Sequence, residues 1–177
     1  PDAPGPTPEA SGATGGALWI NEIHYDNAGD DVGEGIEIAG PDGTPLDGWT
    51  LVLVNGSDGS VYRTVPLAGT LVGDGIGTEW VPVEGLQNGS PDGAALVAPD
   101  RRVVEALSWE GTLVARGGAV NGIRFEDIGV QETSSDAPGM SLQRTGRGRA
   151  ARDFRWTSGV AASPGWLNAG QQAAGGR

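Results

Sequence analysis

Short runs of alternating hydrophobic and polar residues recur along the chain, separated by stretches rich in glycine, proline and aspartate. The first two runs, Leu18–Tyr25 and Gly35–Ala39, flank an acidic loop and predict a β-hairpin. Because side chains alternate along a strand, Ile20 is expected on one face of the first run and Ile23 and Tyr25 on the opposite face.

Further runs of the same kind predict more strands. The run 49–54 is apolar on both faces, which is typical of a central strand covered on both sides. Because proline cannot donate to the hydrogen-bond ladder, Pro66 predicts an edge strand or a strand end, and Pro82 predicts an edge-like strand. The predicted strands are Trp49–Val54, Val61–Leu67, Glu79–Val83, Ala94–Ala98, Val103–Trp109, Met140–Arg144 and Asp153–Thr157.

The connections between these runs favour an all-β fold. Asn55–Gly59 is typical of a hairpin connection, and Leu71–Thr78 is expected to be a glycine-spaced loop. The pattern of residues 111–138 predicts no secondary-structure element. Glycine recurs too often for a helical stripe of useful length, so we expect little or no helix. Several short strands at near-regular spacing predict an antiparallel β-sandwich.

Composition divides the chain into three parts. Residues 1–16 are rich in proline, glycine and alanine, which predicts a flexible linker or tail with too little hydrophobic surface to fold. Residues 17–170 hold the strand pattern and all six tryptophans, which predicts one β-sandwich domain. Residues 171–177 are expected to be a frayed C-terminus.

Charge and cysteine content narrow the functional classes. The net charge is −12; residues 1–100 carry 16 acidic residues and one arginine, and there is no lysine. An acidic surface repels nucleic acid, so nucleic acid is a disfavoured partner. The absence of cysteine excludes disulfides and thiolate chemistry. No apolar run approaches the ~20 residues that span a membrane, so the sequence predicts a soluble chain without a transmembrane segment.

The acidic loop is the strongest candidate site. Carboxylate and amide oxygens at irregular spacing suit Ca²⁺, although the spacing matches no EF-hand. Alternatively, the loop is solvated or its carboxylates cap backbone amides of the hairpin. The candidate calcium ligands are Asp26, Asn27, Asp30, Asp31 and Glu34.

Catalytic constellations are sparse, and we expect no enzymatic activity. His24 is the single histidine and no serine lies in a nucleophile-elbow motif, so it is interpreted as a surface or packed strand residue. A carboxylate-based hydrolase using Glu22, Glu34 or Glu37 would require two carboxylates about 5–10 Å apart in a cleft.

Arginine and tryptophan offer two further candidate contacts. Five of the 11 arginines lie within twelve residues and could contact phosphate or another polyanion, or pair with the acidic half of the chain. They are Arg144, Arg147, Arg149, Arg152 and Arg155. Trp166 lies in a Pro-Gly setting and is the tryptophan expected to be exposed, where it could stack on carbohydrate.

Several motifs together resemble the bacterial branch of the lamin tail domain family. The resemblance covers roughly residues 18–170, and Gly35 departs from it because the family usually carries an aromatic there. The motifs are Ile20–Ile23 (INEI), Glu34–Pro41 (EGIEIAGP), Leu46–Trp49 (LDGW), Gly85–Gly89 (GLQNG), Ser141–Gly146 (SLQRTG), and Ser163–Gly165 (SPG) with Asn168.

This resemblance implies an immunoglobulin-like β-sandwich and a function without catalysis. Bacterial relatives are joined to secreted nucleases, phosphoesterases and other extracellular domains, which implies a binding, anchoring or structural module of a secreted or cell-surface protein. A protein or cell-surface partner is favoured. The alternatives are a calcium-stabilised adhesive domain, or an accessory domain that contacts nucleic acid. The sequence names neither the partner, nor neighbouring domains, nor the oligomeric state.

Overall fold

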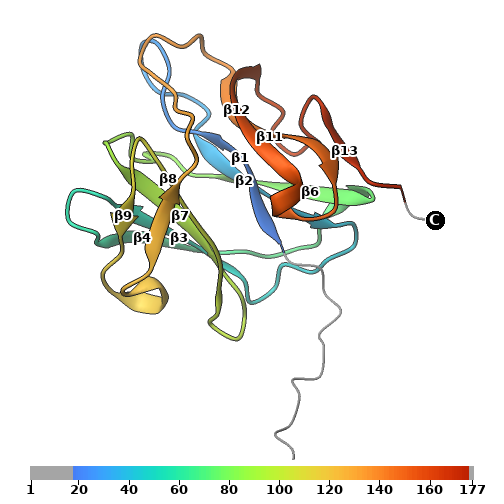
Figure 1. Ribbon diagram of the computed structural model, residues 1–177, viewed down its shortest axis with the longest axis horizontal. Coiled ribbons are helices and arrows are strands. Elements are labelled where there is room, and N and C mark those ends of the chain that lie inside the picture. Colours follow the sequence, from blue (N-terminus) through green and yellow to red (C-terminus); the bar gives the residue numbers. More distant parts are fainter. Residues whose placement is uncertain (1–17, 176–177) are drawn as a thin grey trace, which may run out of the picture.

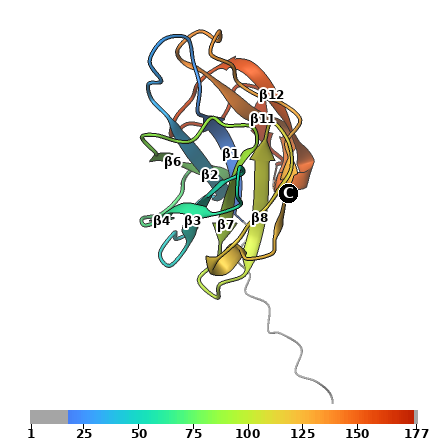
Figure 2. The same cartoon turned by 90° about the vertical axis from the view of Figure 1, so that its left-hand side faces the viewer.

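The computed structural model describes residues 18–175 of the chain. These residues form two β-sheets and the loops that connect their strands. Figures 1 and 2 show the sheets as two stacked layers. The predicted all-β sandwich of immunoglobulin-like type is therefore confirmed. Residues 1–16, predicted to be a linker, lie outside the described residues.

The seven-stranded sheet contains both termini of the described chain. In spatial order its strands are β12 (Phe154–Ala161), β11 (Met140–Gly148), β1 (Trp19–His24), β2 (Gly35–Pro41), β6 (Ile76–Pro82) and β5 (Val72–Asp74), with β13 (Gln171–Ala173) beside β11. The predicted opening hairpin is β1 and β2, which pair antiparallel across the acidic loop.

The six-stranded sheet forms the second layer. Its order is β4 (Val61–Pro66), β3 (Thr50–Asn55), β7 (Asp92–Val97), β8 (Val103–Trp109), β10 (Arg124–Asp127) and β9 (Leu113–Val114). Residues 18–175 contain no α-helix, only the short 3₁₀ turns η1 (Gly118–Val120) and η2 (Ala151–Asp153). None of the described helices could therefore span a membrane.

Two strand pairs depart from the antiparallel expectation. β10 runs parallel to β8, and β13 runs parallel to β11. Both pairs form where the chain crosses over before it returns to a sheet, which local alternation cannot indicate. β10 and β9 also occupy part of 111–138, where the sequence assigned no element.

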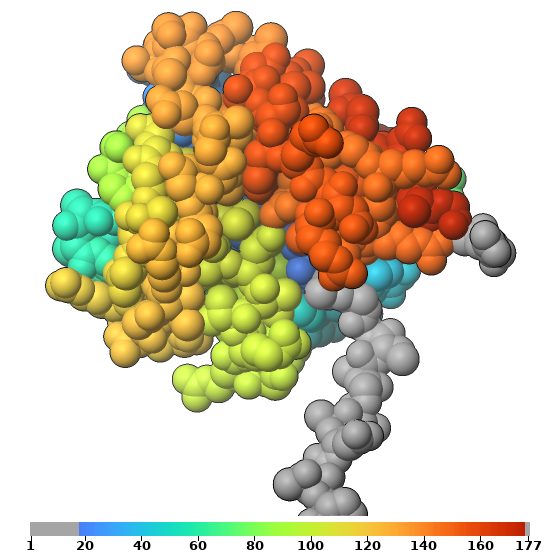
Figure 3. Space-filling model, viewed as in Figure 1, coloured from blue at the N-terminus to red at the C-terminus, as the bar shows by residue number. Residues whose placement is uncertain are grey.

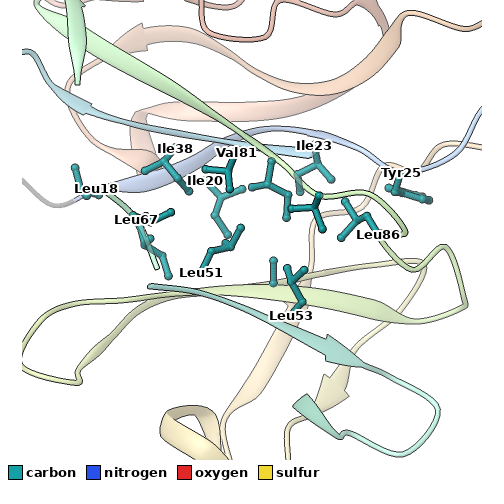
Figure 4. Close-up of a cluster of buried hydrophobic side chains, with 14 of the residues drawn as sticks. Leu18, Ile20, Ile23, Tyr25, Ile38, Leu51, Leu53, Leu67, Val81 and Leu86 are labelled. Carbon is teal, nitrogen blue, oxygen red and sulfur yellow. The ribbon is translucent and has the colours of Figure 1, made fainter. Parts of the chain in front are cut away.

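A β-bulge in β1 changes which side chains enter the core. The register with β2 shifts between Ile20 and Glu22, so the alternation restarts there. As a result Ile20, Ile23 and Tyr25 all lie in the core cluster between the sheets, where Figure 4 shows them. The predicted opposite placement of Ile23 and Tyr25 was wrong for this reason.

β3 is the predicted central strand. It pairs with β4 on one side and β7 on the other. Leu51 and Leu53 enter the core between the sheets, whereas Val52 and Val54 pack in a second cluster around Phe125. The two-sided apolar pattern of this run therefore reflects cover on both faces, as predicted.

The glycine-spaced segment 71–78 is not a loop. It contains β5 and the start of β6, joined at Gly75, whose φ is +78°. A Cβ on Gly73 would lie 1.9 Å from the carbonyl oxygen of Ile76, so glycine allows this tight hairpin. β5 pairs only with residues 76–78 of β6. Residues 79–82 pair with β2 alone, as expected for the edge-like strand predicted at Glu79–Val83.

The C-terminal end is more ordered than its composition suggests. Of the predicted frayed residues 171–177, Gln171–Ala173 form β13 against β11, and the Gln171 side chain is buried. Residues 176–177 lie outside the described part of the chain.

Candidate functional site

The acidic loop between β1 and β2 is organised by its own amide side chain. Asn27 is buried, its Nδ2 donates to the carbonyl oxygens of Ala28 and Asp30, and its Oδ1 accepts from the backbone N–H of Val32. The backbone N–H of Asn27 donates to Asp31 Oδ1 over 3.1 Å. The loop conformation is therefore held by hydrogen bonds between its own residues.

The carboxylates of the loop are partly engaged as well. Glu34 accepts from the backbone N–H of Gly85 over 2.8 Å, and Asp30 is exposed. Burial raises the pKa of Asp26, and the neighbouring Asp31 carboxylate adds to this rise. Among residues 18–175, no three or more histidine, aspartate or glutamate side chains converge in a group that could hold a metal ion. The calcium site stays a prediction.

The structure separates Arg144 from the other four arginines of its cluster. Arg144 is buried, its Nε donates to the carbonyl oxygen of Ile20, and its guanidinium pairs with Glu105 of β8. The guanidinium also lies 4.9 Å from the ring centroid of Trp156. Arg144 therefore bridges the two sheets and offers no free charge to a polyanion.

The remaining arginines are exposed at the end of the seven-stranded sheet. They are Arg147, Arg149, Arg152 and Arg155. Figure 3 shows the deep orange to red end of the chain, which includes β11, β12 and β13, gathered on one side. A polyanion contact through these four side chains stays a prediction.

A buried polar network lies on the outer face of the seven-stranded sheet, and the sequence did not predict it. Glu22 and Glu37 face each other across β1 and β2, and both are fully buried. They are covered by residues 162–172, hereafter the covering segment. Glu22 accepts hydrogen bonds from Ser141 Oγ at 2.7 Å and from the Ser163 N–H and Oγ at 2.9 and 2.8 Å.

Glu37 is held by one side chain and one backbone amide. Asn21 Nδ2 donates to Oε1 and the N–H of Gly165 donates to Oε2, each over 2.9 Å. Burial raises the pKa of Glu37 to about 8, and the negative charge of Glu22 adds to the rise. Glu37 therefore keeps its proton near neutral pH.

Amide side chains complete the network. Asn168 Nδ2 donates to the carbonyl oxygens of Asn21 and Arg144, and Gln171 exchanges two hydrogen bonds with the Asn21 side chain. These bonds attach the covering segment to β1 and β11. Because Glu22 and Glu37 are closed off from solvent, this pair offers no open cleft for a hydrolase.

A second buried pair lies at the end of β1. His24 Nδ1 is 2.9 Å from Glu132 Oε1, and its Nε2 is 3.0 Å from the carbonyl oxygen of Val32. The hydrogen bond to Glu132 raises the pKa of His24 above its ordinary 6.5. Both ring nitrogens face acceptors, so the geometry fits a protonated imidazolium. His24 is therefore a packed strand histidine with a structural role.

A groove between the covering segment and strands β5 and β6 is the open feature of the outer face. We call it the Trp166 groove; its volume is about 550 Å³. Trp166 is 77% exposed, as the sequence predicted, and Val72 on the facing edge strand is 74% exposed. The lining residues are Val72, Gly73, Asp74, Ile76, Thr78, Glu79, Gly165, Trp166 and Leu167.

A second cavity adjoins the groove. Its volume is about 730 Å³, and it shares Asp74, Ile76 and Leu167 with the groove. Arg149 lines this second cavity, and the Arg149 Nε donates to the carbonyl oxygen of Ala174. The groove itself is lined by carboxylates and no cationic side chain.

Three comparisons with known proteins found no match for this chain. No family model matches it, and neither the curated proteins nor the solved structures contain a match. The resemblance to the lamin tail domain family is therefore supported by the quoted motifs alone. The exposed Trp166 was visible in the sequence, but its partner Val72 lay in a segment interpreted as a loop.

Proposed function

We propose that this chain is a non-catalytic binding or anchoring module whose contact surface is the Trp166 groove. One observation carries the proposal: the two most exposed large hydrophobic side chains among residues 18–175, Trp166 and Val72, line the same groove. They come from segments 94 residues apart in sequence, which the fold places together.

Burial of this exposed apolar surface against a partner would supply the free energy of binding. Burying apolar surface yields about 25 cal/mol per Å², so covering a tryptophan ring against a partner contributes on the order of a few kcal/mol. Tryptophan is also among the residues that dominate binding energy at protein interfaces. A tryptophan opposite a valine, both held in solvent, is what such an interface looks like before its partner binds.

The cellular setting rests on the motifs that resemble lamin tail domains. On that ground we propose that the module belongs to a secreted or surface-attached bacterial protein and that its partner is a protein or cell-surface component. The buried carboxylate pair and the buried His24 support a structural rather than a catalytic role for the acidic residues of this hairpin.

Retention on bacterial cell envelope preparations tests the proposal. We expect Trp166→Ala and Val72→Ser to lower the bound fraction several-fold, because each removes apolar surface from the groove. Val114→Ser is the matched control, since Val114 is also exposed, at 51%, but lies on β9 of the other sheet. Equal retention of all four proteins would contradict the proposal.

A further inference from the structure

We propose that the Trp166 groove binds a basic peptide segment of a partner protein, with an arginine or lysine side chain over the Trp166 ring. This inference rests on the binding function proposed above and adds the chemistry of the ligand. Its starting point is the position of a carboxylate beside an exposed aromatic ring: Asp74 lines the same groove as Trp166 and lies on the face of β5 that carries Val72. Glu79 also borders this groove, although its side chain alternates to the face of Val81.

The charges of the groove are free to meet a ligand. Asp74 and Glu79 are both exposed, and within residues 18–175 neither forms an ion pair. A guanidinium or ammonium group over a tryptophan face gains about 0.5–1 kcal/mol at an exposed site and more when desolvated. The Asp74 carboxylate on the groove face supplies hydrogen-bond acceptors that such a cation requires.

The whole chain favours the same charge sign. Residues 1–100 carry 16 acidic residues and one arginine, and these residues include β5 and β6 of the groove. A field of this sign attracts cationic partners and raises their association rate. This negative field would not raise the affinity of the groove for a neutral sugar, and it would repel a polyanion.

The edge strand beside the groove favours side-chain recognition over strand addition. The Gly73 N–H donates to Asp42 Oδ1 over 3.0 Å, so this edge donor is already occupied. β5 is also only three residues long. A peptide would therefore gain little from pairing with this edge. The ring of Trp166 and the Asp74 carboxylate then supply the recognition, with the charge of Glu79 at the border of the groove.

Nuclear magnetic resonance with defined peptides tests this inference. The probe is a capped hexapeptide of alternating arginine and glycine, and the matched probe replaces arginine with glutamine. The Trp166 indole N–H signal is identified by its loss in Trp166→Phe. We expect the arginine peptide to shift this signal to saturation, the glutamine peptide to shift it at least ~5-fold more weakly, and 0.5 M salt to reduce binding.

Charge variants locate the effect. We expect Asp74→Asn/Glu79→Gln to weaken arginine-peptide binding at least ~5-fold. Asp47→Asn/Glu84→Gln removes the same charges outside the groove and should leave affinity within about twofold. Both variants keep the backbone and side-chain size, and their spectra report directly whether the fold is kept.

The other outcomes are distinguishable. Equal binding of both peptides through Trp166 would overturn the basic-peptide inference and keep the groove as a binding surface. Absence of peptide binding, with envelope retention still dependent on Trp166, would likewise overturn the basic-peptide inference and keep the groove as a binding surface. Binding of the arginine peptide that leaves the Trp166 signal unchanged would overturn the placement in this groove.

Discussion

Glu37 is a carboxyl group whose environment differs strongly from that of an exposed carboxylate. It is fully buried beside Glu22, and no cation accompanies the pair among its hydrogen-bond partners. Two buried carboxylates at adjacent strand positions cannot both ionise without a large cost. The protein therefore keeps the proton on Glu37, and folding is coupled to pH at this position.

This coupling has a definite sign. The folded pKa of Glu37, about 8, lies above the ordinary 4.5. The folded state therefore binds the proton more tightly, and the free energy of unfolding should fall as pH rises from about 4.5 to 8. At about 1.4 kcal/mol per pKa unit the loss is on the order of a few kcal/mol. Urea unfolding at a series of pH values measures it.

Glu37→Gln identifies the source of the pH dependence. Because glutamine does not titrate, the slope of unfolding free energy against pH should flatten over this range, whatever the change in absolute stability. Glu84→Gln, at an exposed position, should retain the wild-type slope. A wild-type slope in Glu37→Gln would show that Glu37 is not the titrating group.

Gly35, the position at which the chain departs from the lamin tail motifs it resembles, is closely covered by the neighbouring strand. A Cβ at Gly35 would lie 2.5 Å from Cζ2 of Trp80 and 2.7 Å from the carbonyl oxygen of Val81. The Trp80 ring, from the neighbouring strand β6, thus occupies the space above this glycine.

Gly35→Ala should therefore destabilise the fold by about 1–3 kcal/mol, because Trp80 must move. Chemical denaturation followed by tryptophan fluorescence measures the loss. In a Trp80→Ala background the same substitution should cost less, so the two changes should be non-additive. Additive costs would mean that Trp80 does not fill this space.

At the scale of elements, the Glu132 side chain attaches the segment 128–137 to the end of β1. Glu132 is buried and accepts from the backbone N–H of Tyr25 at 2.6 Å and of Asp26 at 3.0 Å, besides its pair with His24. The Tyr25 hydroxyl accepts in turn from the Glu132 N–H. An otherwise irregular segment is therefore fixed by charge-assisted hydrogen bonds.

Glu132→Ala should release this segment and cost about 3–5 kcal/mol, because it leaves Nδ1 of the buried His24 and two backbone amides without a partner. Hydrogen exchange at Tyr25 and Asp26 should accelerate, and the pKa of His24 should fall in an NMR titration. In the wild type the pair stabilises fully below about pH 6.5 and loses this contribution as pH rises through the raised His24 pKa. An unchanged His24 pKa would contradict the assignment.

The acidic loop is the element on which the calcium prediction can be decided. A ligand that binds only the folded state at 100 times its dissociation constant adds about 2.7 kcal/mol, so a calcium site predicts an unfolding temperature several degrees higher in millimolar Ca²⁺ than in EDTA. Asp30→Ala/Asp31→Ala should abolish this rise. Identical thermal unfolding curves in Ca²⁺ and in EDTA would contradict the predicted calcium site in this loop.

At the scale of the whole molecule, one ion pair joins the two layers. Arg144 of β11 pairs with Glu105 of β8, and Glu105 also accepts from the backbone N–H of Ile20 over 2.7 Å. The pair is largely buried at the border of the core. The pair is also attached to β1, because Glu105 accepts from the backbone N–H of Ile20 and Arg144 donates to the Ile20 carbonyl oxygen.

Arg144→Ala should destabilise the sandwich by about 3–5 kcal/mol, because it leaves Glu105 buried without a counter-charge. The double change Arg144→Met/Glu105→Gln should recover part of this loss, since it removes both charges and keeps side-chain volume. Thermal or urea unfolding measures both variants. A double variant less stable than Arg144→Ala would show that the ion pair is not the reason for the loss.

The sequence by itself determined the fold class, the opening hairpin, the central strand β3 and the exposure of Trp166. These features depend on hydrophobic alternation, two-sided apolar runs and turn residues, which act between near neighbours in the chain. The same local rules failed at the β1 bulge and at β5, where one residue or one close backbone approach changes the pattern.

Only the tertiary structure decided which polar residues are buried and which surface is open. Glu22 and Glu37 occupy strand positions that alternation assigns to solvent, yet the covering segment, more than 120 residues later, closes over them. The Trp166 groove likewise forms because that segment lies beside β5. Burial is set by what packs on a side chain, and contacts between distant segments leave no periodic signal in the sequence.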